Sequence, residues 1–271
     1  DAVCVGSSRL MQMNSSMIDG KLFNFSVSGA SVEDIFAISL ESIAKVNPKS
    51  IYIGLDPWIV NINNNQKRYK SILDIYEYWL TELSSENANI KPYVPNLNES
   101  ISKSPLQTFL NRIHSRVSQS SNLSTPLHGK QEAIAKKSYD GSHIYDLKYS
   151  NLGNEIVYEQ FNDWINYGMN DFVYDEKSEI ILLKLLKYLN SKNYNVFLIL
   201  SPYHPEFYKK IQKEQLRIIE IERKFRNLAK KLNLTILGSY DPSKFGLSSE
   251  EFYDGIHPKE SAMAKVLSQN Y

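Results

Sequence analysis

The opening run Ala2-Val3-Cys4-Val5 limits the folds open to this chain more than any other stretch. The run is short and apolar, and it ends in Gly6-Ser7-Ser8 ahead of a segment of amphipathic residues. A run of this kind, closed by glycine, predicts a buried strand of a parallel sheet that leads into a βα turn. Ligands bind at the carboxyl ends of such strands, and serine is also a common helix cap, so both roles are open to Ser7 and Ser8 at this point.

Strands and helices are expected to alternate along much of the chain. Strands are expected at 21–27, 50–54, 196–200 and 234–237, and helices at 9–17, 31–47, 175–190, 206–232 and from 259 onward. Ser31 and Asp34 have the spacing of a capping box at the start of the second of these helices. This alternation predicts an α/β protein, a three-layer α/β/α sandwich around a five-stranded parallel sheet.

Residues 60–174 interrupt the alternation. The segment has clusters of Asn, Ser and Pro, expected helices at 69–83, 106–117 and 155–167, and an expected turn or hairpin at 140–152. It has no strand set of its own. We therefore expect one domain over 1–271, with a mainly helical insertion at 60–174 between the third and fourth strands.

Composition and charge exclude several classes of function. A formal charge of +1 gives no reason to expect nucleic acid or an anionic membrane as partner, and no stretch has the apolar length of a membrane span. Cys4 is the one cysteine and fits a buried core position. No metal is expected, because His114, His128 and His143 lack metal-ligand spacing. No cofactor is expected, and the first turn lacks the glycines and the lysine of a phosphate-binding loop.

A second polar group lies near the other end of the chain, in Asp254-Gly255-Ile256-His257-Pro258. Acyl transfer through serine needs a nucleophile, a base and a group that orients the base. The spacing of three lets the Asp254 carboxylate hold one imidazole nitrogen of His257 while the other nitrogen faces a serine. Taken singly, Asp254 also fits the role of a helix N-cap. His257 alone also fits a residue at a helix start that makes only local hydrogen bonds.

Together these segments resemble the SGNH (GDSL-like) hydrolase superfamily. That family has its serine third in a Gly-x-Ser turn, a glycine after the second strand, Gly-x-Asn after the third and Asp-x-x-His near the C-terminus. The matching positions here are Gly6-Ser7-Ser8, Gly29, Gly54-Leu55-Asp56 and 254–257. The resemblance implies a flavodoxin-like SGNH fold with Ser8 as nucleophile, His257 as base and Asp254 as the orienting carboxylate, while Ser7 occupies the variable position. It also implies an oxyanion hole formed by Ser8, Gly29 and Asp56.

Asp56 departs from the family pattern, which has asparagine at this position. An ionised carboxylate would repel the oxyanion, so three outcomes are open. Burial keeps Asp56 protonated, or Asp56 turns away to bind a substrate hydroxyl, or it caps the turn before Pro57. Because the loss of one donor typically costs roughly 10²–10³ in rate, we expect slow hydrolysis of simple esters.

Gly-Ser-Ser-Arg at 6–9 and Asp-Pro-Trp at 56–58 resemble most closely the SGNH members linked to O-acylation of bacterial surface glycans. This resemblance implies a serine esterase or O-acyltransferase, with O-acetyl as the expected group, that acts on a carbohydrate and works with a membrane-bound acyl donor. The expected substrate contacts are Trp58, Tyr145, Tyr203 and His204. Each ring has core packing as an alternative, and His204 also fits a plain loop histidine.

The same resemblance implies a bacterial periplasmic or other extracytoplasmic location. The chain opens inside a strand without methionine, so we expect that a signal or anchor precedes it, while a cytoplasmic location stays open. The alternative function is a catalytically weak or inactive glycan-binding or scaffold protein that keeps the fold. Asp56 is the feature that favours this alternative.

Overall fold

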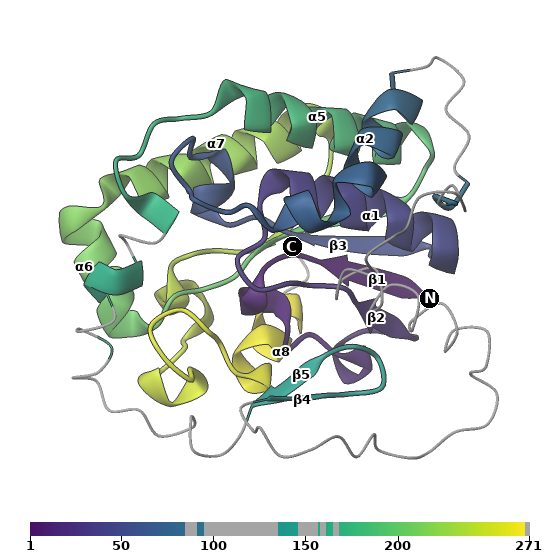
Figure 1. Cartoon of the computed structure of the whole chain (residues 1–271). Helices are drawn as coiled ribbons and strands as arrows, with labels where there is room; N and C mark the ends of the chain where they lie inside the picture. The colour runs from purple at the N-terminus through teal and green to yellow at the C-terminus, as the bar shows by residue number, and fades with distance from the viewer. Residues whose placement is uncertain (85–90, 95–134, 146–156, 158–160, 165–167, 269–271) are drawn as a thin grey trace.

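Five parallel strands form the central sheet of the protein. The computed structural model describes residues 1–84, 91–94, 135–145, 157, 161–164 and 168–268 (Figure 1). The strand order is β2-β1-β3-β6-β7, and every neighbouring pair is parallel. The strands are β1 (Ala2–Val5), β2 (Leu22–Asn24), β3 (Ser50–Gly54), β6 (Asn195–Leu200) and β7 (Thr235–Gly238). The five predicted strands are confirmed, and so is the three-layer α/β/α architecture.

Side chains alternate between the two faces of the sheet. Val3 and Val5 belong to the larger apolar core, whereas Ala2 and Cys4 belong to a smaller one on the opposite face. The larger core lies under α1 (Val32–Val46), α2 (Leu73–Glu82), α5 (Glu176–Ser191) and α7 (Leu216–Leu232). The smaller core lies under α8 (Glu260–Ser268) and two short 3-10 helices (Figure 1). Both faces are covered, and for that reason β1 and β6 have nearly continuous apolar sequences.

Helix α1 begins and ends where local chemistry predicts. The Ser31 hydroxyl accepts from the Asp34 N–H at 3.2 Å, and the Asp34 carboxylate accepts from the Ser31 N–H at 3.0 Å. Asn47 closes the helix in the left-handed conformation that asparagine tolerates. The predicted capping box is confirmed, and it fixes the chain directly after Gly29, at the carboxyl edge of the sheet.

The prediction of a helix at 9–17 is wrong. Two 3-10 turns, Ser8–Leu10 and Ser15–Met17, occupy this segment. The Asn24 amide donates to the carbonyls of Leu10 and Met13, each at 2.8 Å, and so engages acceptors that an α-helix would use itself. The chain after the first strand therefore stays in tight turns against the end of β2.

The single helix expected at 206–232 is two helices. α6 (Pro205–Glu214) and α7 meet at Gln215, whose backbone leaves the helical region at φ −135° and ψ 52°. The junction has neither glycine nor proline, and Ile211 and Ile218 keep helical spacing across it. Local sequence gives no reason for the break. α6 packs on the 3-10 helix Pro242–Phe245, whereas α7 lies along the sheet, so packing sets the two directions (Figure 1).

The expected insertion at 60–174 is described in part. The helix expected at 69–83 is found as the 3-10 helix Arg68–Ile72 followed by α2. The expected hairpin is found as β4 (Ala135–Lys137) and β5 (His143–Tyr145), which begins earlier than predicted. The helix expected at 106–117 lies outside the described residues. Of the helix expected at 155–167, only 157 and 161–164 are described, and these are helical.

Gly238 at the end of β7 offers a test of this packing. It has φ +85°, and a Cβ there would collide with the Leu200 carbonyl oxygen, whereas Gly246 has φ +60° and open space around it. We expect Gly238→Ala to lower the free energy of unfolding by about 3 kcal/mol or more, because overpacking adds to backbone strain. Gly246→Ala should cost about 1 kcal/mol, from strain alone. Urea denaturation measures both, and equal losses would contradict the close approach of β6 and β7.

Candidate active site

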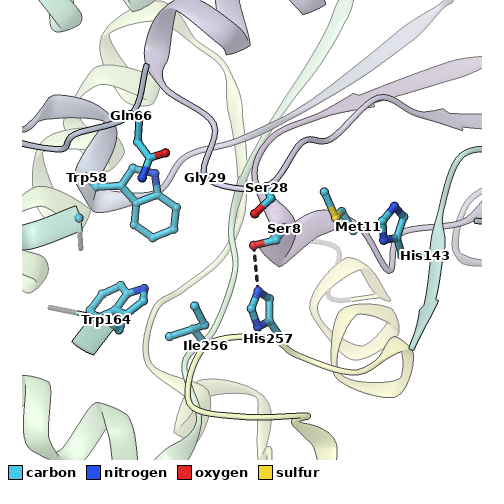
Figure 2. Close-up of a pocket in the computed structure, with 11 residues that line it drawn as sticks. Ser8, Met11, Ser28, Gly29, Trp58, Gln66, His143, Trp164, Ile256 and His257 are labelled. Atoms are coloured by element: carbon cyan, nitrogen blue, oxygen red, sulfur yellow. Dashed lines mark hydrogen bonds between the residues drawn. The ribbon is translucent and has the colours of Figure 1, made fainter. Parts of the chain in front are cut away.

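A cavity of about 350 Å³ opens at the carboxyl edge of the sheet (Figure 2). Its walls come from the segments after β1, β2 and β3, from the β4–β5 hairpin, from Trp164 and Gly168, and from the segment before α8. The lining residues are Ser8, Met11, Ser28, Gly29, Trp58, Gln66, His143, Trp164, Gly168, Ile256 and His257. The cavity lies where the sequence predicted a site, at the ends of parallel strands.

Ser8, His257 and Asp254 form a continuous chain of hydrogen bonds. His257 Nε2 lies 2.8 Å from Ser8 Oγ, and His257 Nδ1 lies 2.7 Å from Asp254 Oδ2 (Figure 2). The distances fit an imidazole that donates its Nδ1–H to the carboxylate and accepts the serine hydroxyl proton at Nε2. The structure thus brings together the three residues that the sequence singled out, although 249 positions separate Ser8 from His257.

Asp254 is held in place as an acceptor. Its Oδ1 atom accepts from the N–H groups of Ile256 and His257, each at 2.8 Å, which leaves Oδ2 for the imidazole. Burial acts to raise the pKa of Asp254, but the charge and hydrogen bond of His257 and the two backbone bonds outweigh it and hold the pKa below its ordinary value. Asp254 therefore stays ionised beside the imidazole and can stabilise the imidazolium that a proton transfer creates.

The backbone N–H groups of Ser8 and Gly29 are the candidate oxyanion donors, and both residues line the cavity. Ser8 opens a 3-10 helix, so its N–H has no partner within that helix, and Gly29 has φ +59°. Among the described residues, neither N–H donates to a protein acceptor. The positive φ favours glycine at this position, whereas a Cβ there would meet only the end of the Gln66 side chain, which can shift.

Asp56 does not supply a third oxyanion donor. Its Oδ1 atom accepts from Arg9 Nη1 at 2.8 Å, and the residue is 3% exposed and outside the cavity lining. A carboxylate paired with a buried guanidinium has no proton to donate and does not reach a substrate hydroxyl. Its side chain also makes no cap bond to the turn at Pro57. None of the three outcomes left open by the sequence is found. Asp56 instead forms an ion pair with Arg9, the residue directly after Ser8.

Of the three expected substrate contacts whose side chains the structure describes, Trp58 lines the cavity and Tyr203 and His204 do not. Tyr203 is wrong as a contact, because it is fully buried with the Arg9 guanidinium 3.8 Å from its ring centre. His204 is also wrong as a contact, because it is 3% exposed and its Nδ1 accepts the Glu206 N–H at the start of α6. Burial lowers the pKa of His204. Tyr145 belongs to β5, and its side chain lies outside the described residues.

Several cavity residues were missed in the sequence. Trp164 lies edge-on to Trp58, with ring centres 6.0 Å apart, and Figure 2 shows this pair on one side of Ser8 with Met11 and His143 on the other. Ser28 lines the wall next to Gly29. A serine directly before the predicted oxyanion glycine was a usable signal, but no local pattern brings residues 66, 143 and 164 to this edge.

Docking of the hairpin explains how His143 reaches the site. The Asp140 carboxylate accepts from the Ser15 N–H at 3.1 Å, and the Asp140 carbonyl accepts from the Asn24 N–H at 2.7 Å. The His143 N–H donates to the Met11 carbonyl at 2.7 Å. The turn of the hairpin is therefore fixed to the segments after β1 and β2, and His143 becomes part of the cavity wall.

No group of three or more His, Cys, Asp or Glu side chains within the described ranges is placed to hold a metal ion. Nor does that part of the chain contain a helix long and apolar enough to cross a bilayer.

A comparison of the chain with protein-family models and with curated proteins finds no match. The case for a function therefore depends on the geometry of the site and on the residues that compose it.

The charge of Asp254 gives a testable pH dependence of stability. A carboxyl whose pKa falls on folding stabilises the native state at pH values above its pKa in the unfolded chain, 3.8, and this contribution is lost as the pH falls through the lower pKa of the folded state. We expect wild type to have a higher Tm than Asp254→Asn near pH 5, with the difference shrinking between pH 5 and pH 3. Asparagine retains an acceptor for the two N–H groups but replaces the acceptor of the imidazole with an NH2 donor, so only the part of the Tm difference that changes with pH reports the charge. A difference that grows on acidification would contradict a lowered pKa.

Proposed function

We propose that this protein is a serine-dependent esterase or O-acyltransferase of the SGNH type that acts on an acylated carbohydrate. The observation that carries the proposal is the hydrogen-bonded chain from Ser8 through His257 to Asp254, which opens into a cavity. A serine hydroxyl, a histidine that accepts its proton and an ionised carboxylate behind that histidine are the parts that acyl transfer needs.

In the proposed reaction, Ser8 Oγ attacks the ester carbonyl carbon while its proton passes to His257 Nε2. The N–H groups of Ser8 and Gly29 stabilise the oxyanion, and the Asp254 carboxylate stabilises the imidazolium. The tetrahedral intermediate then collapses to an acyl-enzyme, and the leaving alkoxide takes the proton from Nε2. Water or a sugar hydroxyl next gives its proton to His257, attacks the acyl carbon and releases Ser8.

Hydrolysis and transfer use the same protein groups in this scheme. The two reactions differ in their products: hydrolysis gives a free carboxylic acid, and transfer gives a new sugar ester. The two backbone donors, without a side-chain amide at position 56, support the expectation of slow turnover on simple esters. The proposed acyl-donor partner and extracytoplasmic location follow from the family resemblance alone.

The carbohydrate part of the proposal is supported by the cavity wall. Trp58 and Trp164 form an aromatic surface near Ser8, while Ser28, Gln66 and His143 supply a few polar groups. Mostly apolar walls with a few placed polar groups are typical of small-molecule sites. A binding-only protein was the alternative, and Asp56 was the feature that favoured it. The ion pair with Arg9 gives Asp56 a structural role that is compatible with slow catalysis, so Asp56 by itself no longer argues for binding alone.

The serine chemistry is tested by labelling with a fluorophosphonate and mapping the adduct. We expect an adduct on Ser8 in wild type, none in Ser8→Ala, and a labelling rate at least about 10³-fold lower in His257→Ala, because the base is lost. Ser7→Ala is the matched control. Ser7 is fully buried and its hydroxyl accepts from the Arg9 N–H, so this variant should keep the adduct. A folded wild-type protein that gives no adduct, or an adduct on another serine, would contradict the proposal.

The carbohydrate is tested separately with Trp164→Leu. We expect KM for an acetylated oligosaccharide to rise by about fivefold or more, with kcat/KM for p-nitrophenyl acetate within about twofold of wild type, because the small ester does not need the aromatic wall. Tyr188→Leu on α5, outside the cavity, is the control and should change neither value. Equal effects on both substrates would argue against a sugar subsite at this wall.

A further inference from the structure

Arg9, the residue directly after the proposed nucleophile, is fully buried and makes four hydrogen bonds to three other segments. Nη1 donates to Asp56 Oδ1 at 2.8 Å, after β3. Nη2 donates to the carbonyls of Ser201 and Pro202, after β6. Nε donates to the Ile256 carbonyl at 3.1 Å, in the segment that carries His257. One guanidinium therefore joins the ends of β1, β3 and β6 to the loop before α8.

The Ile256 carbonyl is the decisive contact, because it belongs to the peptide group that joins Ile256 to His257. The carbonyl oxygen of this group accepts from Arg9, and its N–H donates to Asp254 Oδ1 at 2.8 Å. The peptide plane is thus held from both ends. Its orientation sets the direction in which the His257 side chain leaves the backbone, and so the position of Nε2 relative to Ser8.

Asp56 has a corresponding role as the countercharge of Arg9. A buried guanidinium is costly unless a charged partner and further acceptors compensate it. Asp56, with a side chain 4% exposed, supplies the charge, and the three carbonyls supply the other acceptors. The Tyr203 ring covers one face of the guanidinium at 3.8 Å. An asparagine at position 56 would leave this cation without a countercharge.

We propose that Arg9 is a positioning residue that fixes His257 toward Ser8 by holding the Ile256 carbonyl, and that Asp56 is its countercharge. The catalytic consequence rests on the proposed serine function, whereas the positional claim concerns the fold alone. Arg9 does not line the cavity and contacts no reacting atom. Its effect passes through the Ile256–His257 peptide group.

The first test is Arg9→Lys, which keeps the charge and the pairing with Asp56 but cannot reach three segments at once. We expect kcat for p-nitrophenyl acetate to fall about 10- to 100-fold with KM within about twofold, because a small displacement of the base acts on the transition state. Active-site titration with fluorophosphonate corrects for any unfolded fraction. A kcat per active site equal to that of wild type would overturn the proposal.

Arg226→Lys is the matched control. Arg226 on α7 also pairs with a carboxylate, Glu222, and donates to a backbone carbonyl, that of Gly238, but it lies outside the cavity. We expect this variant to lose stability and to keep the wild-type kcat per active site. The same loss of kcat in Arg226→Lys would show that Arg9 acts only through general stability, and would overturn the positional claim.

Proton NMR tests the positional claim without any substrate. A proton held between His257 Nδ1 and Asp254 Oδ2 at 2.7 Å should give a strongly downfield resonance in wild type and in Arg226→Lys, and a weakened or absent one in Arg9→Lys. Asp56→Asn, which removes the countercharge, should weaken it too and provides a second variant if Arg9→Lys does not fold. An unchanged resonance in a folded variant at either position would overturn the proposal even if wild type proves inactive, so it fails separately from the proposed function.

Discussion

A parallel sheet brings the carboxyl ends of all its strands to one edge, and the candidate site depends on this constraint. Segments after β1, β2 and β3 meet there although they are far apart in the chain, and the loop before α8 closes on them. No single segment contains a complete site. Ser8, His257 and the proposed oxyanion donors come together only when the sheet has its final strand order.

The parts of the fold that the sequence predicts well are those fixed by short-range physics. The apolar run Ala2–Val5 predicted a buried strand, and the Ser31 and Asp34 pair could be recognised as a capping box. The pairing of Asp254 with His257 was predictable for the same reason, because three positions on a turn bring the two side chains together. Their meeting with Ser8 required the parallel topology and the family resemblance as well.

Three of the wrong predictions share a cause, which is that polar groups distant in the sequence decide the local outcome. Asn24 takes the carbonyls that a helix after β1 would use, so tight turns replace the helix. Tyr203 has the sequence position of a pocket residue, but the guanidinium of Arg9 packs on its ring and closes it off from solvent. Asp56 stood at the position of an expected oxyanion donor. Its partner Arg9 lies 47 positions away, so the ion pair could not be inferred from sequence spacing.

The distance along the chain between Ser8 and His257 has a consequence for how the protein is made. A ribosome synthesises from the N-terminus, so the serine leaves the exit tunnel long before the histidine exists. During that interval the serine lacks its base, and the Arg9 guanidinium lacks the carbonyl of residue 256. If the proposed function holds, the nascent chain does not react with esters until the last segment has docked, so an incompletely synthesised chain is inactive.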